Sequence, residues 1–232
     1  MIPELSRMRI REAVMKYGES FFDIAYLGIA IVFGILILKK AQNRTEKWMG
    51  LAVLILGCGD AFHLVPRVLN YFIDADFQAA LGIGKLVTSV TMTVFYVLLY
   101  YIGHSCYPEG KKNSLSAAVW SLAAIRVIVC LFPQNGWLQN ESSMIWGIYR
   151  NISFVALGAI VMILFLKNRK EIPRFRLMWL WILLSFLFYI PVAVFAGLVP
   201  MLGMLMLPKT ICYIIMIITF YQAVSKHEIT EC

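Results

Sequence analysis

Residues 57–67 read Gly-Cys-Gly-Asp-Ala-Phe-His-Leu-Val-Pro-Arg, and they lie within an apolar run that is long enough to cross a membrane. At about 3.6 residues per turn, Asp60, His63 and Arg67 fall on one face of a helix, beside Pro66, which is able to kink it. An ionisable side chain in hydrocarbon costs roughly 2.5–3.5 kcal/mol on insertion scales. We therefore expect this face to line a protein interior or a water-filled cavity.

The composition is that of a membrane protein. Of the 232 residues, 61% are hydrophobic and 15% are charged, whereas soluble domains average about 45–50% apolar and about 25% charged residues. The formal net charge is +8. In a membrane protein such an excess is typical of cytoplasmic loops, so we expect no nucleic-acid partner. The composition predicts a multi-pass protein of the cell (plasma) membrane, in contact with membrane lipids.

Seven apolar runs, each long enough to cross about 30 Å of hydrocarbon, follow one another along the chain. They cover residues 20–39, 48–72, 79–105, 114–133, 143–166, 175–198 and 200–225. Residues 1–18 mix Arg and Lys with apolar residues, which is typical of an amphipathic helix on the membrane surface. We therefore predict an all-α fold, with one transmembrane domain of seven helices over residues 1–232.

The distribution of Lys and Arg predicts the orientation of the bundle. Three loops and the tail hold twelve of them: Lys39, Lys40, Arg44, Lys47, Lys111, Lys112, Lys167, Arg169, Lys170, Arg174, Arg176 and Lys226. The opposite side holds four, all within residues 1–18, and its loops carry Asp74, Asp76 and Glu141. The positive-inside rule then places the N-terminus outside and the C-terminus inside. The basic segment 1–18 is the one piece that disagrees with this orientation.

Matched positions in the two halves of the chain indicate an internal repeat. Phe21–Tyr26 resembles Tyr149–Phe154 at an offset of 128 residues, Pro66 matches Pro191 at 125, and Lys85 matches Lys209 at 124. A slowly drifting offset is typical of a duplication followed by loop trimming, although apolar segments also align easily by chance. Because each helix lies four helices before its mate, both start on the same side of the membrane. We predict parallel three-helix repeats at 20–105 and 143–226, joined by a linker helix at 114–133.

This 3+1+3 arrangement resembles that of the sugar and PQ-loop transporters, the KDEL receptors and the microbial opsins. A second resemblance is local. Gly59-Asp60, followed by the Gly-rich stretch Leu81-Gly82-Ile83-Gly84, is similar to the Gly-Asp motif of the YhhN family of polytopic lysoplasmalogenases. That resemblance implies an intramembrane enzyme that cleaves a vinyl-ether lysolipid. The chain departs from the family pattern, because Ser185 stands where the family has a second intramembrane aspartate.

Five of the 21 Lys and Arg residues lie within the predicted helices: Arg67, Lys85, Arg126, Arg150 and Lys209. Their depths along the helices place all five in the outer half of the bundle, where the carboxylates we expect are those of Asp60 and Asp23. Such an excess of cations repels itself at low dielectric. We therefore predict an outward-facing basic cavity that binds a small anionic solute or an anionic lipid headgroup. The hydroxyls and ring faces of the cavity are expected to come from Tyr96, Tyr149 and Tyr213.

A purely structural interpretation exists for most of these residues. Lys85 and Arg150 lie near helix starts, from which long side chains are able to extend to the headgroups. Arg67 is able to pair with Asp74 or Asp76 of the following loop. Asp60 is able to serve as the counter-ion of His63 or of Lys209.

Three functional classes fit the pattern. A transporter or ligand-binding protein is our main prediction, with Asp60 and His63 coupling movement to protons, because histidine titrates near neutral pH. The alternative is an intramembrane hydrolase of lysophospholipids or lysoplasmalogens, with Asp60 or His63 as catalytic general base. A retinal-binding opsin would use Lys209, but Lys85 stands on the helix where a counter-ion is expected.

We expect no cofactor and no metal, since two buried ligands are too few for a zinc site. A homo-oligomer is compatible with the sequence.

Overall fold

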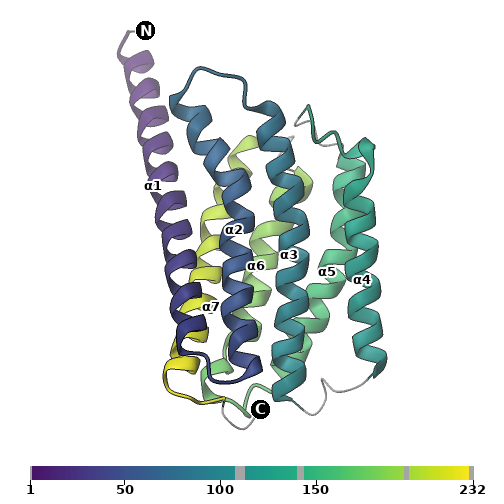
Figure 1. The fold of residues 1–232 in the computed structure, drawn as a ribbon. Coiled ribbons are helices and arrows are strands. Elements are labelled where there is room, and N and C mark those ends of the chain that lie inside the picture. The colour runs from purple at the N-terminus through teal and green to yellow at the C-terminus, as the bar shows by residue number, and fades with distance from the viewer. Residues whose placement is uncertain (1, 108–112, 140–143, 196–198, 230–232) are drawn as a thin grey trace.

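The computed structural model describes residues 2–107, 113–139, 144–195 and 199–229. Within these ranges the chain is all-α, and seven helices are long and apolar enough to cross a membrane. The protein is therefore a seven-helix, multi-pass membrane protein (Figure 1).

The helices follow the chain in the order α1 (Ile2–Lys40), α2 (Arg44–Phe72), α3 (Gln78–Cys106), α4 (Asn113–Leu131), α5 (Met144–Lys167), α6 (Met178–Phe195) and α7 (Met206–Ser225). Three short 3-10 helices lie in the connections: η2 (Pro133–Asn135), η3 (Pro173–Phe175) and η4 (Pro200–Leu205). Each long helix packs against its neighbour in the chain, and α1 also packs against α7. The seven helices therefore close into a ring, which α3 and α5 bridge by a further contact.

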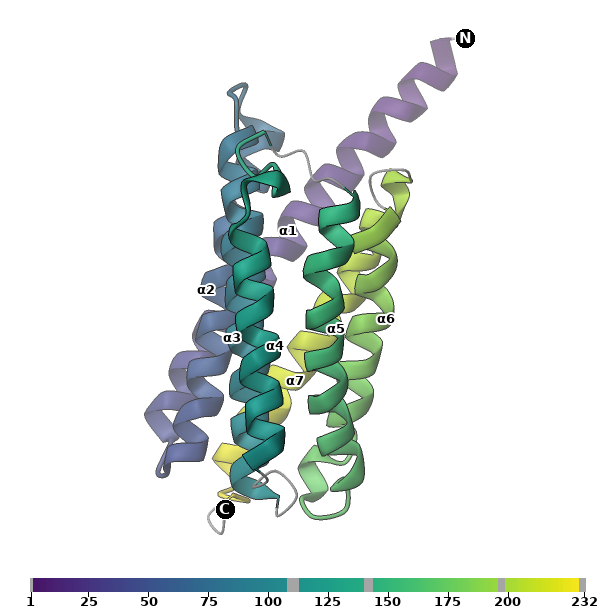
Figure 2. The same cartoon turned by 90° about the vertical axis from the view of Figure 1, so that its right-hand side faces the viewer.

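The two ends of the bundle differ in what they carry. One end carries the α1–α2 and α5–α6 connections and the C-terminal residues, and we call it the C-terminal end (Figure 1). The other carries the α2–α3 connection, η2 and η4, and we call it the N-terminal end. At that end the first part of α1 projects away from the other helices (Figure 2).

The start of α2 lies before its apolar run, because a capping group satisfies backbone donors in the preceding polar segment. α2 begins at Arg44, where the Asn43 side chain accepts a hydrogen bond from the Glu46 backbone N–H at 2.8 Å. In return, the Glu46 carboxylate accepts from the Gln42 backbone N–H at 2.6 Å. The helix therefore begins four residues before the predicted apolar run at 48–72.

An aromatic cluster packs the interior of the ring. The Tyr96 ring of α3 meets the Phe154 ring of α5 edge-on, with centroids 5.1 Å apart, and it lies tilted against the Phe186 ring of α6, with centroids 5.3 Å apart. On the α7 side, Phe95 meets Tyr213 edge-on at 5.9 Å. Edge-to-face pairs of this kind stabilise a core beyond the burial of their apolar area.

Two glycines allow α2 and α3 to approach closely. A Cβ atom at Gly84 of α3 would overlap the backbone of Phe62 and His63 in α2. A Cβ atom at Gly59 of α2 would overlap the side chain of Thr91 in α3. The glycines thus bring the helix that carries Asp60 into backbone contact with α3.

The seven-helix prediction is confirmed, with some differences at the boundaries. The run predicted at 200–225 is divided into η4 and α7. The predicted break after residue 18 does not interrupt α1, because helical hydrogen bonding continues from Ile2 to Lys40. The leaflet on which residues 1–18 lie, the orientation of the bundle and the three-helix repeats stay predictions. Lys111, Lys112 and Glu141 lie outside the described residues.

Candidate functional site

A small hollow lies between α1, α2 and α7, toward the N-terminal end of the bundle. Its volume is about 80 Å³, which is space for a few water molecules or one compact polar group. The lining residues come from α1, α2, Thr88 of α3, η4 and α7: Glu19, Asp23, Tyr26, Asp60, His63, Leu64, Arg67, Thr88, Gly203, Met206, Leu207, Lys209 and Thr210. We call it the α1–α2–α7 hollow.

An ion pair joins α1 to α2 at this site. The Arg67 Nη2 atom lies 2.6 Å from Glu19 Oε2, and both side chains are only partly exposed, at 28% and 21%. The Tyr71 hydroxyl donates to the same carboxylate oxygen at 2.8 Å, while Arg67 Nε donates to the Tyr71 hydroxyl at 3.4 Å. The three side chains therefore form one closed polar cluster, in which Arg67 is neutralised by Glu19.

Asp60 is held by a tyrosine of the neighbouring helix. The Tyr26 hydroxyl, whose residue is 1% exposed, donates to Asp60 Oδ2 at 2.7 Å. Lys209 of α7 is an electrostatic neighbour of Asp60. The Lys209 Nζ atom also lies 4.7 Å from the ring centroid of Tyr189 and 5.4 Å from that of Tyr213, within cation–π range. Asp60 and Lys209 are thus electrostatic neighbours in the lining, without an ion pair of 4.0 Å or less between them in the described structure.

Asp23 is different, because one of its oxygens has no partner. The residue is 6% exposed, and its Oδ2 atom makes no hydrogen bond with any of the described residues. Its electrostatic neighbours are the cation Arg67 and the carboxylates Glu19 and Asp60. Since a buried polar group without a partner costs free energy, this oxygen indicates that something further belongs in the hollow.

His63 faces the same hollow from α2. Its Nδ1 atom lies 3.4 Å from the Leu81 carbonyl oxygen of α3, close to the point at which Gly84 meets the backbone of His63. Arg67, Lys85 and Lys209 are electrostatic neighbours of its ring. Asp60, His63 and Arg67, which the sequence places on one helix face, therefore all line one hollow.

The charges of the lining are close to balance. Its carboxylates are Glu19, Asp23 and Asp60, and its permanent cations are Arg67 and Lys209. The excess of positive charge on which the prediction of an anionic ligand depends is absent from the described lining of the hollow. Of the five helix cations, two lie here and three lie elsewhere.

Arg126 and Arg150 are held by aromatic and amide groups on the other side of the ring. Arg126 is 2% exposed, with its guanidinium carbon 3.3 Å from the centroid of the Phe154 ring, and its Nε and Nη1 atoms have no hydrogen-bond partner among the described residues. Arg150 donates from Nη1 to Asn135 Oδ1 at 3.0 Å, and it lies 4.7 Å from the Trp137 ring. Both guanidinium groups therefore use ring faces as partners.

The remaining predicted residues are dispersed. Lys85 of α3 is half-buried, with Arg67 and Arg150 as electrostatic neighbours. The Tyr96 hydroxyl bonds to the Ser185 hydroxyl at 3.2 Å inside the aromatic cluster, and Tyr213 is 2% exposed. Tyr149 is 55% exposed and packs edge-on against Trp146 at 6.0 Å. None of these four belongs to the described lining of the hollow.

Sequence reasoning missed Glu19 and Tyr26. Residues 19, 23 and 26 follow the helical spacing of one face, and all three line the hollow from α1. This spacing was available as a signal, but the predicted helix start at residue 20 separated Glu19 from the other two.

No group of three His, Cys, Asp or Glu side chains is placed to hold a metal ion among the residues that the structure describes. Asp60 and His63, the residues considered for catalysis, both line the hollow, where their described hydrogen bonds go to Tyr26 and to the Leu81 carbonyl and not to each other. Comparison of this chain with family models, with curated proteins and with solved structures finds no match.

Proposed function

We propose that the protein is a transport or ligand-binding protein whose site is the α1–α2–α7 hollow, and that its ligand is a small zwitterionic solute. The observation that carries the proposal is the buried Asp23 oxygen without a partner. Glu19 is paired to Arg67 and Asp60 accepts a hydrogen bond from Tyr26, whereas Asp23 has an oxygen without a hydrogen-bond partner among the described residues. A proton or an ammonium group balances a buried carboxylate at lower cost than leaving it alone.

The two charges of a zwitterion match the two kinds of group in the hollow. Asp23 accepts hydrogen bonds from the ammonium group. Lys209 forms no ion pair of 4.0 Å or less within the described residues, so it faces the anionic group of the solute as a point charge. The anionic group that the sequence predicts for the ligand is thus kept, and an ammonium group is added to it. A volume of about 80 Å³ limits the bound part to a compact group.

Movement of α1 against α2 and α7 would connect the hollow with the surroundings. The Glu19–Arg67 pair joins α1 to α2 at the part of the hollow nearer the N-terminal end. η4, whose Gly203 belongs to the lining, leads directly into α7 and Lys209. A site formed by three helices is suited to alternating access, in which the helices move around bound solute.

Uptake into proteoliposomes tests the proposal. Radiolabelled solutes of three charge classes are added outside the vesicles, and their uptake is compared: glycine as zwitterion, choline as cation and inorganic phosphate as anion. A pH-sensitive dye inside the vesicles reports any accompanying movement of protons. We expect uptake or saturable binding of the zwitterion, and an at least tenfold loss of that signal in Asp23→Asn and Asp60→Asn. Asp74→Asn, which changes an exposed acid of the α2–α3 connection, is the matched control. Selective response to phosphate alone, or equal loss in all three variants, would contradict the proposal.

An intramembrane lipid hydrolase is the second candidate, favoured by the presence of Asp60 and His63 in one hollow. Asp60 would act as general base toward a water molecule in the hollow. The same proteoliposomes, given lysophosphatidylethanolamine and its vinyl-ether analogue, decide this point by mass spectrometry of the products. Turnover that is lost in Asp60→Asn, with glycine binding absent, would favour the enzyme over the transporter.

A further inference from the structure

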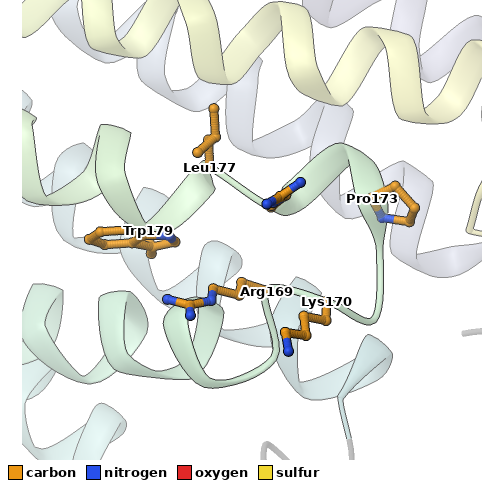
Figure 3. A pocket seen from close by; sticks show the side chains of 6 residues that line it. Arg169, Lys170, Pro173, Leu177 and Trp179 are labelled. Atoms are coloured by element: carbon orange, nitrogen blue, oxygen red, sulfur yellow. The ribbon is translucent and has the colours of Figure 1, made fainter.

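A second, larger depression lies at the C-terminal end of the bundle, between the α5–α6 connection and the first turn of α6. It measures about 570 Å³ and is lined by Arg169, Lys170, Pro173, Arg176, Leu177 and Trp179. Figure 3 shows the six side chains around the opening and labels all of them except Arg176. The volume is within the range of about 300–1,000 Å³ that is usual for small-molecule sites. We call it the α5–α6 notch.

The lining of the notch carries an excess of positive charge, from Arg169, Lys170 and Arg176. Arg174, the fourth cation of the connection, is turned toward the tail, where its Nη2 atom lies 2.9 Å from Glu228 Oε1. Its Nη1 atom donates to Gln222 Oε1 at 3.0 Å. Within the described residues, no ion pair neutralises the three cations of the notch, Arg169, Lys170 and Arg176. The single acid of the connection, Glu171, is exposed and does not belong to the lining.

The other part of the lining is apolar and lies where a membrane-spanning segment begins. The candidate span that contains α6 starts at Pro173, so the notch lies at the level where hydrocarbon gives way to headgroups. Leu177 is 49% exposed, and Trp179 follows it on the first turn of α6. Tryptophan is enriched at this level of membrane proteins because its ring is apolar and its N–H is polar.

We propose that the α5–α6 notch binds the phosphate headgroup of an anionic phospholipid from the surrounding leaflet. The guanidinium groups of Arg169 and Arg176 are each able to donate two parallel hydrogen bonds to phosphate oxygens, and Lys170 adds a point charge. The acyl chains run along Leu177 and Trp179. Basic pockets between membrane helices bind anionic headgroups in this way, whereas a soluble phosphate would make no use of the apolar rim. The site is separate from the α1–α2–α7 hollow, and it does not depend on the function proposed for the hollow.

Lipid titration monitored by native mass spectrometry tests this site. The full chain in neutral detergent is titrated with phosphatidylglycerol, and phosphatidylcholine, a zwitterionic lipid without net charge, serves as the reference. We expect the double variant Arg169→Gln/Arg176→Gln to weaken phosphatidylglycerol binding about tenfold. The matched control is Lys39→Gln/Lys47→Gln, which removes the same charge from exposed positions at the same end of the bundle. We expect this control to bind like the wild type.

Three outcomes would overturn the proposal. Equal weakening in both double variants would show that binding follows overall charge and not the notch. Unchanged binding in Arg169→Gln/Arg176→Gln would place the lipid elsewhere. Displacement of phosphatidylglycerol by millimolar inorganic phosphate would make a soluble phosphate, and not a lipid, the occupant. Circular dichroism of each variant, with an unchanged helix signal, confirms that the comparison is made on folded protein.

Discussion

The Tyr26 hydroxyl of α1 donates a 2.7 Å hydrogen bond to Asp60 Oδ2 of α2, between side chains 34 residues apart in the sequence. Tyr26 is 1% exposed, so the bond is shielded from solvent on the tyrosine side. It fixes the carboxylate of Asp60 against α1 while Lys209 approaches from α7. The carboxylate of Asp60 therefore links α1 to α2 by a hydrogen bond, with a cation of α7 as its electrostatic neighbour.

Tyr26→Phe removes that hydrogen bond and leaves the Asp60 oxygen without its donor. We expect a loss of about 1.5–3 kcal/mol in the free energy of unfolding, as is usual for a hydrogen bond to a charged group. Denaturant unfolding in detergent, followed by circular dichroism, measures the change. Tyr149→Phe is the control, because Tyr149 is 55% exposed and keeps its ring contact with Trp146. Equal losses in both variants would argue against a special role for the Tyr26–Asp60 bond.

The pairing of Glu19 with Arg67 predicts energetic coupling between α1 and α2. In a double-mutant cycle with Glu19→Gln and Arg67→Met, we expect a coupling free energy of about 1–2 kcal/mol, above the value for a fully exposed pair. The reason is partial burial, since the two side chains are 28% and 21% exposed. Thermal unfolding of the four proteins supplies the cycle. A coupling below about 0.5 kcal/mol would mean that the pair behaves like an ordinary surface ion pair.

Asp23→Asn tests the cost of the unpartnered carboxylate in the empty protein. At pH 8 and without ligand, we expect the substitution to raise the free energy of unfolding by about 1 kcal/mol, because it removes a buried charge that has one oxygen without a hydrogen bond and two other carboxylates as electrostatic neighbours. The melting temperature in detergent, compared with Asp74→Asn, measures this gain. A lower melting temperature for Asp23→Asn would indicate that the carboxylate makes a stabilising interaction, which would contradict the charge balance proposed for the hollow.

Gly84→Ala tests the close approach of α3 to α2. The added methyl group would overlap the backbone of Phe62 and His63, which is unable to yield as a flexible side chain would. We expect a loss of about 1–3 kcal/mol in stability and a displaced His63. Gly28→Ala is the matched control, since a Cβ atom there meets nothing within 4 Å. That variant should be unchanged or more stable by up to about 1 kcal/mol, as is usual for Gly→Ala within a helix. Equal effects at both sites would mean that α2 and α3 are not in backbone contact.

Periodicity along a single helix was the reliable part of the sequence argument. It placed Asp60, His63 and Arg67 on one face, and these three residues line one hollow. Hydropathy was reliable as well. It predicted the seven membrane-spanning segments, because hydropathy over about 20 residues depends on the cost of transfer into hydrocarbon and not on the partners of each helix.

What the sequence left undetermined is the rotation of each helix against its neighbours. Depth along a helix can be counted in residues, and Arg126 and Arg150 were placed by depth alone. Their direction depends on packing, and the structure directs them to the rings of Phe154 and Trp137. Glu19 was missed for a related reason, since the apolar run of α1 begins after it, whereas the helical hydrogen bonding does not. The internal repeat and the orientation of the bundle stay predictions.

The continuity of α1 has a mechanical consequence. Glu19 follows Ile2 by seventeen positions of one continuous helix. At about 1.5 Å per residue this makes an arm of roughly 25 Å, which leads without a break into the helix face carrying Glu19, Asp23 and Tyr26. Part of this arm stands clear of the other helices (Figure 2). A stiff rod transmits a sideways push along its length, so a force applied to the first residues of the protein acts directly on the charged groups that surround the hollow.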